Sequence, residues 1–94
     1  MENFFNFNRE DIDIFLKQAN ETSLALFKQG DDFINEYVIT NELSKKDKLK
    51  DIEIMIKHFV EEERYEDCAL LVEVKNRIKK YYDKQIELLL KNIK

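Results

Sequence analysis

One histidine, one cysteine and a dense run of carboxylates are the residues of this chain that could do chemistry. In order along the chain they are His58, Glu61, Glu62, Glu63, Glu66, Asp67 and Cys68. Carboxylates beside a histidine can bind cations, and a thiol beside a histidine can act as a nucleophile. Cation sites, however, need ligands that converge from a fixed geometry, such as a twelve-residue loop with a glycine at its bend, and no such spacing occurs. A di-metal site between paired helices would need Glu-x-x-His, and Met55 stands where that pair needs its glutamate. We therefore expect a solvated charged turn, with no catalytic residue, no metal and no cofactor.

These residues lie where two helical patterns meet. The link between the patterns is so short that the second helix must return antiparallel to the first. We expect a helical hairpin over residues 45–94, with Tyr65 plugging the bend and small Cys68 and Ala69 letting the backbones approach closely. Phe59 and Leu71 complete the residues expected to build the hairpin.

Each arm of the hairpin has its own apolar row. Ser44 with Asp47 predicts a cap at the start of the first arm. Its expected seam is Leu49, Ile52, Ile56, Phe59 and Glu63, widened by Met55 and Val60. The second arm is expected from about Glu66 to Lys91 or beyond, facing the first through Leu71, Val74, Ile78, Tyr81 or Tyr82, Ile86 and Leu89. Because this arm is the longer one, we expect its overhang, residues 81–94, to receive the N-terminal helix or a second subunit.

The residues at the bend resemble the UVR motif, the helical hairpin of the UvrB and UvrC excision-repair subunits. The matching run is Glu61-x-Glu63-x-Tyr65-Glu66-x-Cys68-Ala69-x-Leu71, followed by Ile78, within about residues 49–80. The chain has Val72-Glu73 where the family usually has Arg-Asp. In that family the hairpin binds other proteins and has no catalytic residues. The resemblance implies a protein partner. We expect its candidate contacts at Glu62, Tyr65, Glu66, Glu73, Arg77, Tyr81 and Tyr82.

The N-terminal segment, residues 1–44, is acidic and predicts one or two further helices. It has 3 Lys/Arg against 9 Asp/Glu, a net charge of −6, whereas residues 45–94 have 13 against 11, a net charge of +2. Asn8 predicts a cap, and Gly30 predicts the end of the first helix before a second over residues 31–43. The first helix has one apolar face, at Ile12, Phe15, Leu16, Ala19, Leu26 and Phe27. The preceding Phe4, Phe5 and Phe7 fit either a core staple or an exposed hook.

The composition predicts one all-α domain, a helical bundle in which the N-terminal helices pack on the long hairpin. The 94 residues include no proline and one glycine, and 44% of them are hydrophobic. A chain this short buries only a modest core, and its helices have more apolar surface than one neighbour covers, so we expect a homo-oligomer. With one cysteine and neither a signal peptide nor a membrane span, the expected location is the cytoplasm.

A non-enzymatic interaction protein, regulatory or inhibitory toward a larger partner, is the function that these features favour. The alternative is an oligomeric binder of nucleotides or other small ligands, or a phage-like protein that blocks a nucleic-acid site. The basic and aromatic run from Lys75 to Lys84, with Tyr81 and Tyr82, supports that alternative. Because Asp83 and Glu87 interrupt the basic residues, a protein partner is favoured over nucleic acid.

Overall fold

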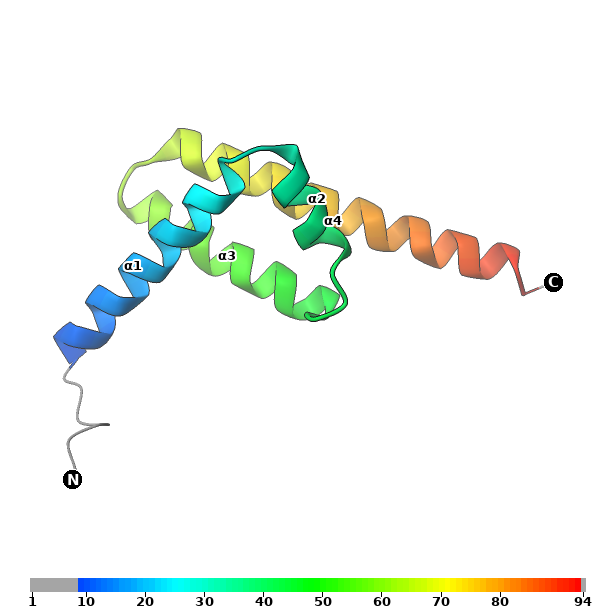
Figure 1. Ribbon diagram of the computed structural model, residues 1–94, viewed down its shortest axis with the longest axis horizontal. Coiled ribbons are helices and arrows are strands. Elements are labelled where there is room, and N and C mark those ends of the chain that lie inside the picture. Colours follow the sequence, from blue (N-terminus) through cyan, green and yellow to red (C-terminus); the bar gives the residue numbers. More distant parts are fainter. Residues whose placement is uncertain (1–8, 94) are drawn as a thin grey trace, which may run out of the picture.

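Four helices make up the described part of the chain, residues 9–93, in a computed structural model (Figure 1). They are α1 (Arg9–Phe27), α2 (Asp31–Ile39), α3 (Lys45–Glu61) and α4 (Tyr65–Lys91). α3 and α4 form the antiparallel hairpin, and no strand occurs within residues 9–93. The predicted all-α hairpin with packed N-terminal helices is therefore confirmed. The predictions for Asn8 and for Phe4, Phe5 and Phe7 concern residues outside the described part.

Local capping chemistry sets the ends of these helices. The Ser44 hydroxyl accepts a hydrogen bond from the Asp47 backbone N–H at 3.1 Å, so α3 begins where the sequence predicts. Gly30, with φ of 130°, separates α1 from α2 in a conformation that strains other residues. At the bend, Glu63 has φ of 58°, and the Arg64 N–H donates to the Phe59 carbonyl at 2.9 Å. This left-handed closing turn ends α3.

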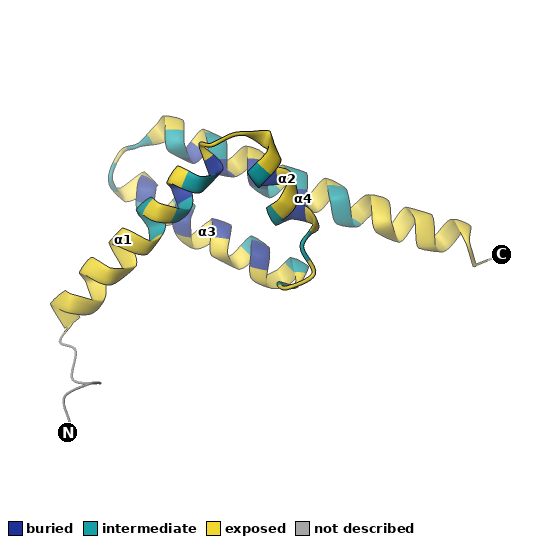
Figure 2. Cartoon of the chain, viewed as in Figure 1, coloured by how far each residue is buried: buried dark blue, intermediate teal, exposed yellow. Residues whose placement is uncertain are grey.

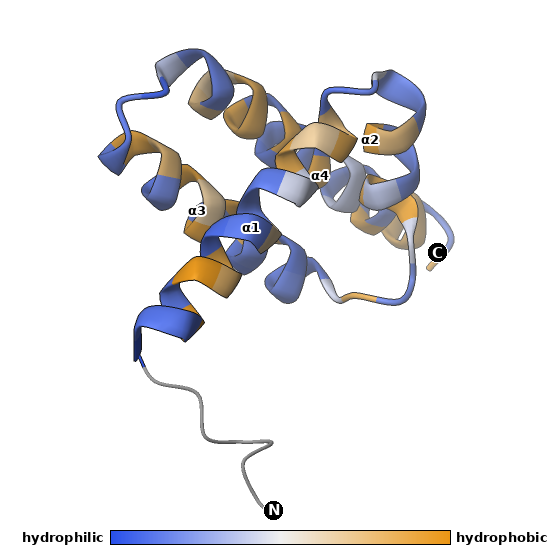
Figure 3. Cartoon of the chain, turned by 60° about the vertical axis from the view of Figure 1, so that its left-hand side comes forward, coloured by the Kyte–Doolittle hydropathy of each residue, from blue (hydrophilic) through white to orange (hydrophobic). Residues whose placement is uncertain are grey.

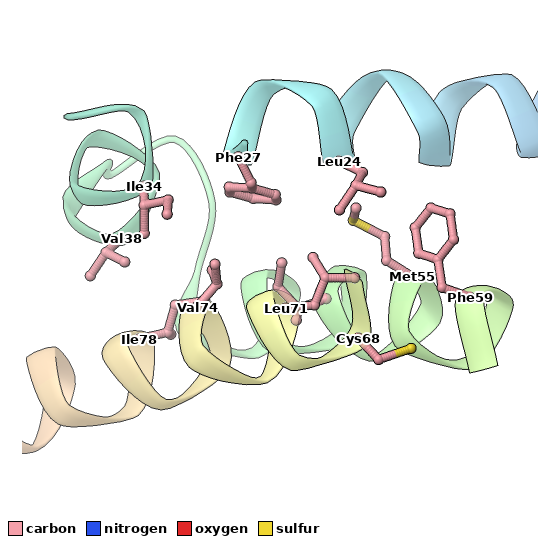
Figure 4. Packing of buried hydrophobic residues seen from close by; sticks show 11 residues of the cluster. Leu24, Phe27, Ile34, Val38, Met55, Phe59, Cys68, Leu71, Val74 and Ile78 are labelled. Atoms are coloured by element: carbon pink, nitrogen blue, oxygen red, sulfur yellow. The ribbon is translucent and has the colours of Figure 1, made fainter. Parts of the chain in front are cut away.

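The core fills the space between α3 and α4 and is covered by α2 and the C-terminal half of α1 (Figure 4). Its apolar members are Leu24, Phe27, Ile34, Val38, Ile52, Met55, Phe59, Cys68, Leu71, Val74 and Ile78. Every helix contributes to this set, so the N-terminal helices are part of the single core and do not form a separate unit.

The buried row of α3 is rotated from the predicted seam. Ile52 and Phe59 are buried as expected, but Leu49 and Ile56 are only partly buried. Met55, expected to widen the seam, is buried as well, Lys48 is buried without having been predicted, and Val60 is exposed. The buried residues are thus Lys48, Ile52, Met55 and Phe59, at spacings of 4, 3 and 4 along the helix. The physical reason is that α3 packs against α1 and α2 as well as against α4, so its buried face lies between these neighbours.

Tyr65 does not plug the bend, contrary to the prediction. It is the first residue of α4 and is 63% exposed. The predicted place belongs to Phe59, which is fully buried and has the Arg64 guanidinium 4.6 Å from its ring centroid. Residues seven apart lie on the same face of a helix, so the position two turns before the buried Leu71 is Arg64. Tyr65, one residue later, therefore points outward.

The N-terminal helix does not dock on the overhang of α4, which rules out one of the two occupants predicted there, and a second subunit stays a prediction. α1 packs near the bend, and its first part projects from one end of the molecule while α4 projects from the opposite end (Figure 1). We call residues 9–19 the N-terminal arm and residues 79–93 the C-terminal arm. Residues 9–19 and 83–93 are exposed throughout, as the yellow ribbons show (Figure 2).

The two arms give the molecule an elongated outline, with extents of 59 × 36 × 21 Å. Within residues 9–93, the helices lack the combination of length and apolar composition that a bilayer crossing requires.

Candidate interaction surfaces

Arg64 is the centre of an ion-pair network at the bend. Its Nε donates to Asp67 Oδ2 at 2.9 Å, and its Nη1 contacts Glu62 and Glu21 of α1. Lys28, at the end of α1, lies 2.8 Å from Asp67 Oδ1. The hydrogen bond from Lys28 is the largest of the effects that hold the pKa of Asp67 below its ordinary value, and Arg64 adds to it. Part of the carboxylate run thus belongs to ion pairs that hold α1 against the bend, whereas the sequence had predicted solvated charge.

Three side chains of this region could ligate a metal ion. The ligating atoms of Glu21, His58 and Glu62 lie within 4.8 Å of one another, and His58 Nε2 is buried without a hydrogen-bond partner. However, Arg64 pairs with both carboxylates, and Lys17 lies 3.6 Å from Glu62. A divalent cation would meet two positive side chains there. The geometry therefore favours an ion-pair network, which the sequence missed because Glu21 comes from a distant helix.

Lys48 is a fully buried cation in the middle of the fold. Its Nζ donates to the carbonyls of Val38 at 2.8 Å and Thr40 at 2.7 Å, and to the Tyr82 hydroxyl at 2.8 Å. The two carbonyls lie at the C-terminal end of α2, where a positive charge is favourable. Lys48 thus joins α2, α3 and α4, and all three of its ammonium hydrogens have acceptors.

A small apolar groove lies among α1, α2 and α3. Its volume is about 220 Å³, below the roughly 300–1,000 Å³ typical of ligand pockets. Its lining is mainly apolar, with Tyr37, Asp51 and Asn20 among the polar members. Burial, with a smaller effect from the negative charge of Asp51, raises the pKa of Tyr37 to about 12. The groove is therefore a poor candidate for an active site.

The raised pKa of Tyr37 predicts a loss of stability in alkali. The phenol titrates near 10 in the unfolded chain and near 12 in the folded one, so the folded state holds its proton longer. Its stabilising contribution is complete below about pH 10 and falls as the pH rises toward 12. Chemical unfolding at several pH values should show a steeper decline for the wild type than for Tyr37→Phe. Parallel declines would contradict this assignment.

The most extensive exposed apolar surfaces lie on the two arms. On the N-terminal arm the aligned residues are Ile12, Phe15 and Leu16, and on the C-terminal arm Ile86, Leu89, Leu90 and Ile93; Ile14 and Leu88 are also exposed on these arms but lie outside the aligned sets. With Ala19 included, each arm has the spacing i, i+3, i+4, i+7, which is one face of a helix. We call these sets the α1 stripe and the α4 stripe. Figure 3 shows hydrophobic colour along the projecting part of α1 as well as in the packed interior.

The predicted interface residues do not form one patch. Arg77 Nη2 contacts Asp31 of α2 at 3.1 Å and also pairs with Glu73. Glu62 belongs to the ion-pair network of Arg64 at the bend. The rings of Tyr81 and Tyr82 pack edge to face, half-buried against the core. Tyr65 and Glu66 are exposed, at the start of α4.

The predicted hairpin residues have mixed outcomes. Phe59, Cys68 and Leu71 are buried in the core as expected. Ala69 is exposed and so does not provide the close approach predicted for it. Cys68 alone does so, with its Sγ 3.7 Å from the Ile56 carbonyl oxygen of α3. The buried row of α4 passes through position 68, which turns position 69 away from α3.

Comparison of the chain with protein-family models, with curated proteins and with solved structures finds no match. The resemblance of the bend to the UVR motif stays a prediction.

Proposed function

We propose that this chain is a non-enzymatic protein-interaction module that binds its partner through the α1 and α4 stripes. The observation that carries the proposal is that seven large apolar side chains, in two regular helical rows, are 47–72% exposed on arms that project from the core. An apolar helix face of this kind usually packs against a groove or another helix. The UVR-like features of the hairpin are in keeping with such a role.

The stripes supply part of the free energy that binding requires. Fully burying one such side chain stabilises by about 1.5–3 kcal/mol, and these are already partly covered. Seven of them therefore offer on the order of 5–10 kcal/mol, against an association cost of about 4–15 kcal/mol. Because these seven side chains already include both stripes, a partner must cover both of them and add contacts of its own to bind tightly.

Protein is favoured over nucleic acid or a nucleotide as the ligand. Lys79, Lys80 and Lys84 line a shallow depression on α4, but Asp83 and Glu87 line it too. The mixed charges reduce its attraction for phosphates.

Capture of partners from the native cell extract tests the proposal. Phe15→Glu and Leu89→Glu each place a charge in the middle of one stripe, at positions 67% and 63% exposed, so the fold should be kept. We expect each to lower partner recovery at least tenfold relative to the wild type, measured by mass spectrometry.

Matched controls are available on the same arms. Gln18→Glu and Gln85→Glu add the same charge at exposed positions beside the stripes. They should recover partners as the wild type does. Equal recovery by all five proteins would overturn the proposal.

A further inference from the structure

We infer that the partner of the two stripes is a second copy of this chain, with the α1 stripe of each copy packed on the α4 stripe of the other. This inference rests on the proposed function and names its partner. The stripes have the same spacing and nearly the same length, so their helices match as packing surfaces. They project from opposite ends of the molecule and therefore cannot pair within one copy (Figure 1).

The charges of the two arms are complementary. The N-terminal arm has Glu10, Asp11 and Asp13 against Arg9 and Lys17, three acidic and two basic residues, net −1. The C-terminal arm has Lys79, Lys80, Lys84 and Lys91 against Asp83 and Glu87, four basic and two acidic residues, net +2. The excess lies at the base of the arm, at Lys79 and Lys80, since the exposed residues 83–93 have two basic and two acidic side chains. Pairing α1 with α1, or α4 with α4, would bring like net charges together, whereas pairing α1 with α4 brings opposite ones together.

The area of the stripes favours a closed, two-fold pair. One contact between an α1 stripe and an α4 stripe joins seven large apolar side chains and covers on the order of 700 Å² at roughly 100 Å² each, a size common among crystal contacts. Two reciprocal contacts cover on the order of 1,400 Å², within the range of stable interfaces. Two elongated copies lying antiparallel bring each N-terminal arm to the other copy's C-terminal arm. Both contacts then form at once, and the assembly closes.

Sedimentation equilibrium of the purified full chain tests the inference. The wild type should have a mass of about 23 kDa, twice the 11.4 kDa of one copy. Phe15→Glu and Leu89→Glu should each be monomeric, with helix content unchanged, because each damages both reciprocal contacts. Since association stabilises the folded state, the melting temperature should rise with protein concentration for the wild type and not for these two variants. Gln18→Glu and Gln85→Glu should stay dimeric.

Mixing the two stripe variants gives the sharper result. A pair made of one Phe15→Glu copy and one Leu89→Glu copy has both changes in one contact and leaves the other intact. The mixture should therefore associate at concentrations where neither variant does alone.

Three results would overturn the inference: a monomeric wild type at all concentrations, a dimeric Phe15→Glu variant that shows α4 pairing with α4, or a ladder of larger species that shows an open chain. A monomeric wild type that still captures another protein through its stripes would leave the proposed function standing.

Discussion

Phe59→Ala should lower the free energy of unfolding by about 3–5 kcal/mol, the usual cost of removing a buried aromatic side chain. Phe59 is fully buried, closes the last turn of α3, and has the Arg64 guanidinium over its ring. Its loss removes packing from the bend and the surface on which Arg64 rests. Because a domain of this size has only about 5–15 kcal/mol of stability, the variant should be close to unfolding. Urea titration followed by circular dichroism measures the change.

The control for this prediction is Tyr65→Ala, because the sequence had predicted Tyr65 as the aromatic side chain that is buried beneath the bend. Because Tyr65 is 63% exposed, its truncation should change the free energy of unfolding by no more than about 0.5 kcal/mol. The opposite order, with Tyr65→Ala the more damaging variant, would show that the bend is built around Tyr65 after all.

Lys48→Met should cost about 2–4 kcal/mol of stability. Methionine keeps the unbranched stem but leaves the buried Val38 carbonyl and the part-buried Thr40 carbonyl and Tyr82 hydroxyl without their donor. A buried acceptor without a partner costs about 1–3 kcal/mol, and removing the buried cation recovers part of the sum. Thermal unfolding should show the loss.

Lys50→Met is the matched control, since Lys50 is exposed on the same helix two residues further on. Its stability should stay within about 0.5 kcal/mol of the wild type. A Lys48→Met variant as stable as the Lys50→Met control would contradict the role given to the buried ammonium. A double-mutant cycle that combines Lys48→Met with Tyr82→Phe measures the coupling energy between Lys48 and Tyr82.

The course of the chain was predictable because its signals are local. Ser44 with Asp47, the lone Gly30 and the short charged link each mark a helix end through the chemistry of a few neighbouring residues. The hairpin follows from that link. No tertiary information is needed for any of these predictions.

The choice of buried face was not predictable, since it depends on which helices cover which side. Lys48 stands in line with Ile52 and Met55, but its charge excluded it from a row chosen by hydrophobicity. Only the fold shows the carbonyls of α2 that satisfy it. Glu21 joins the bend only because α1 crosses there.

The arms show the same limit. The helical spacing of the α1 and α4 stripes is readable in the sequence, but such spacing usually predicts burial. That both stripes are left uncovered is a property of the arrangement of the helices (Figure 2).

Photo-crosslinking in the native cell tests most directly whether the stripes are binding surfaces. A benzophenone amino acid replaces Leu89 in the α4 stripe in one version of the chain and the exposed Lys50 of α3 in another. Irradiation should join the version labelled at position 89 to a protein, seen as a discrete band of higher mass, and should leave the version labelled at position 50 at the mass of one copy. Equal yields from both positions, or no adduct from position 89, would contradict the account.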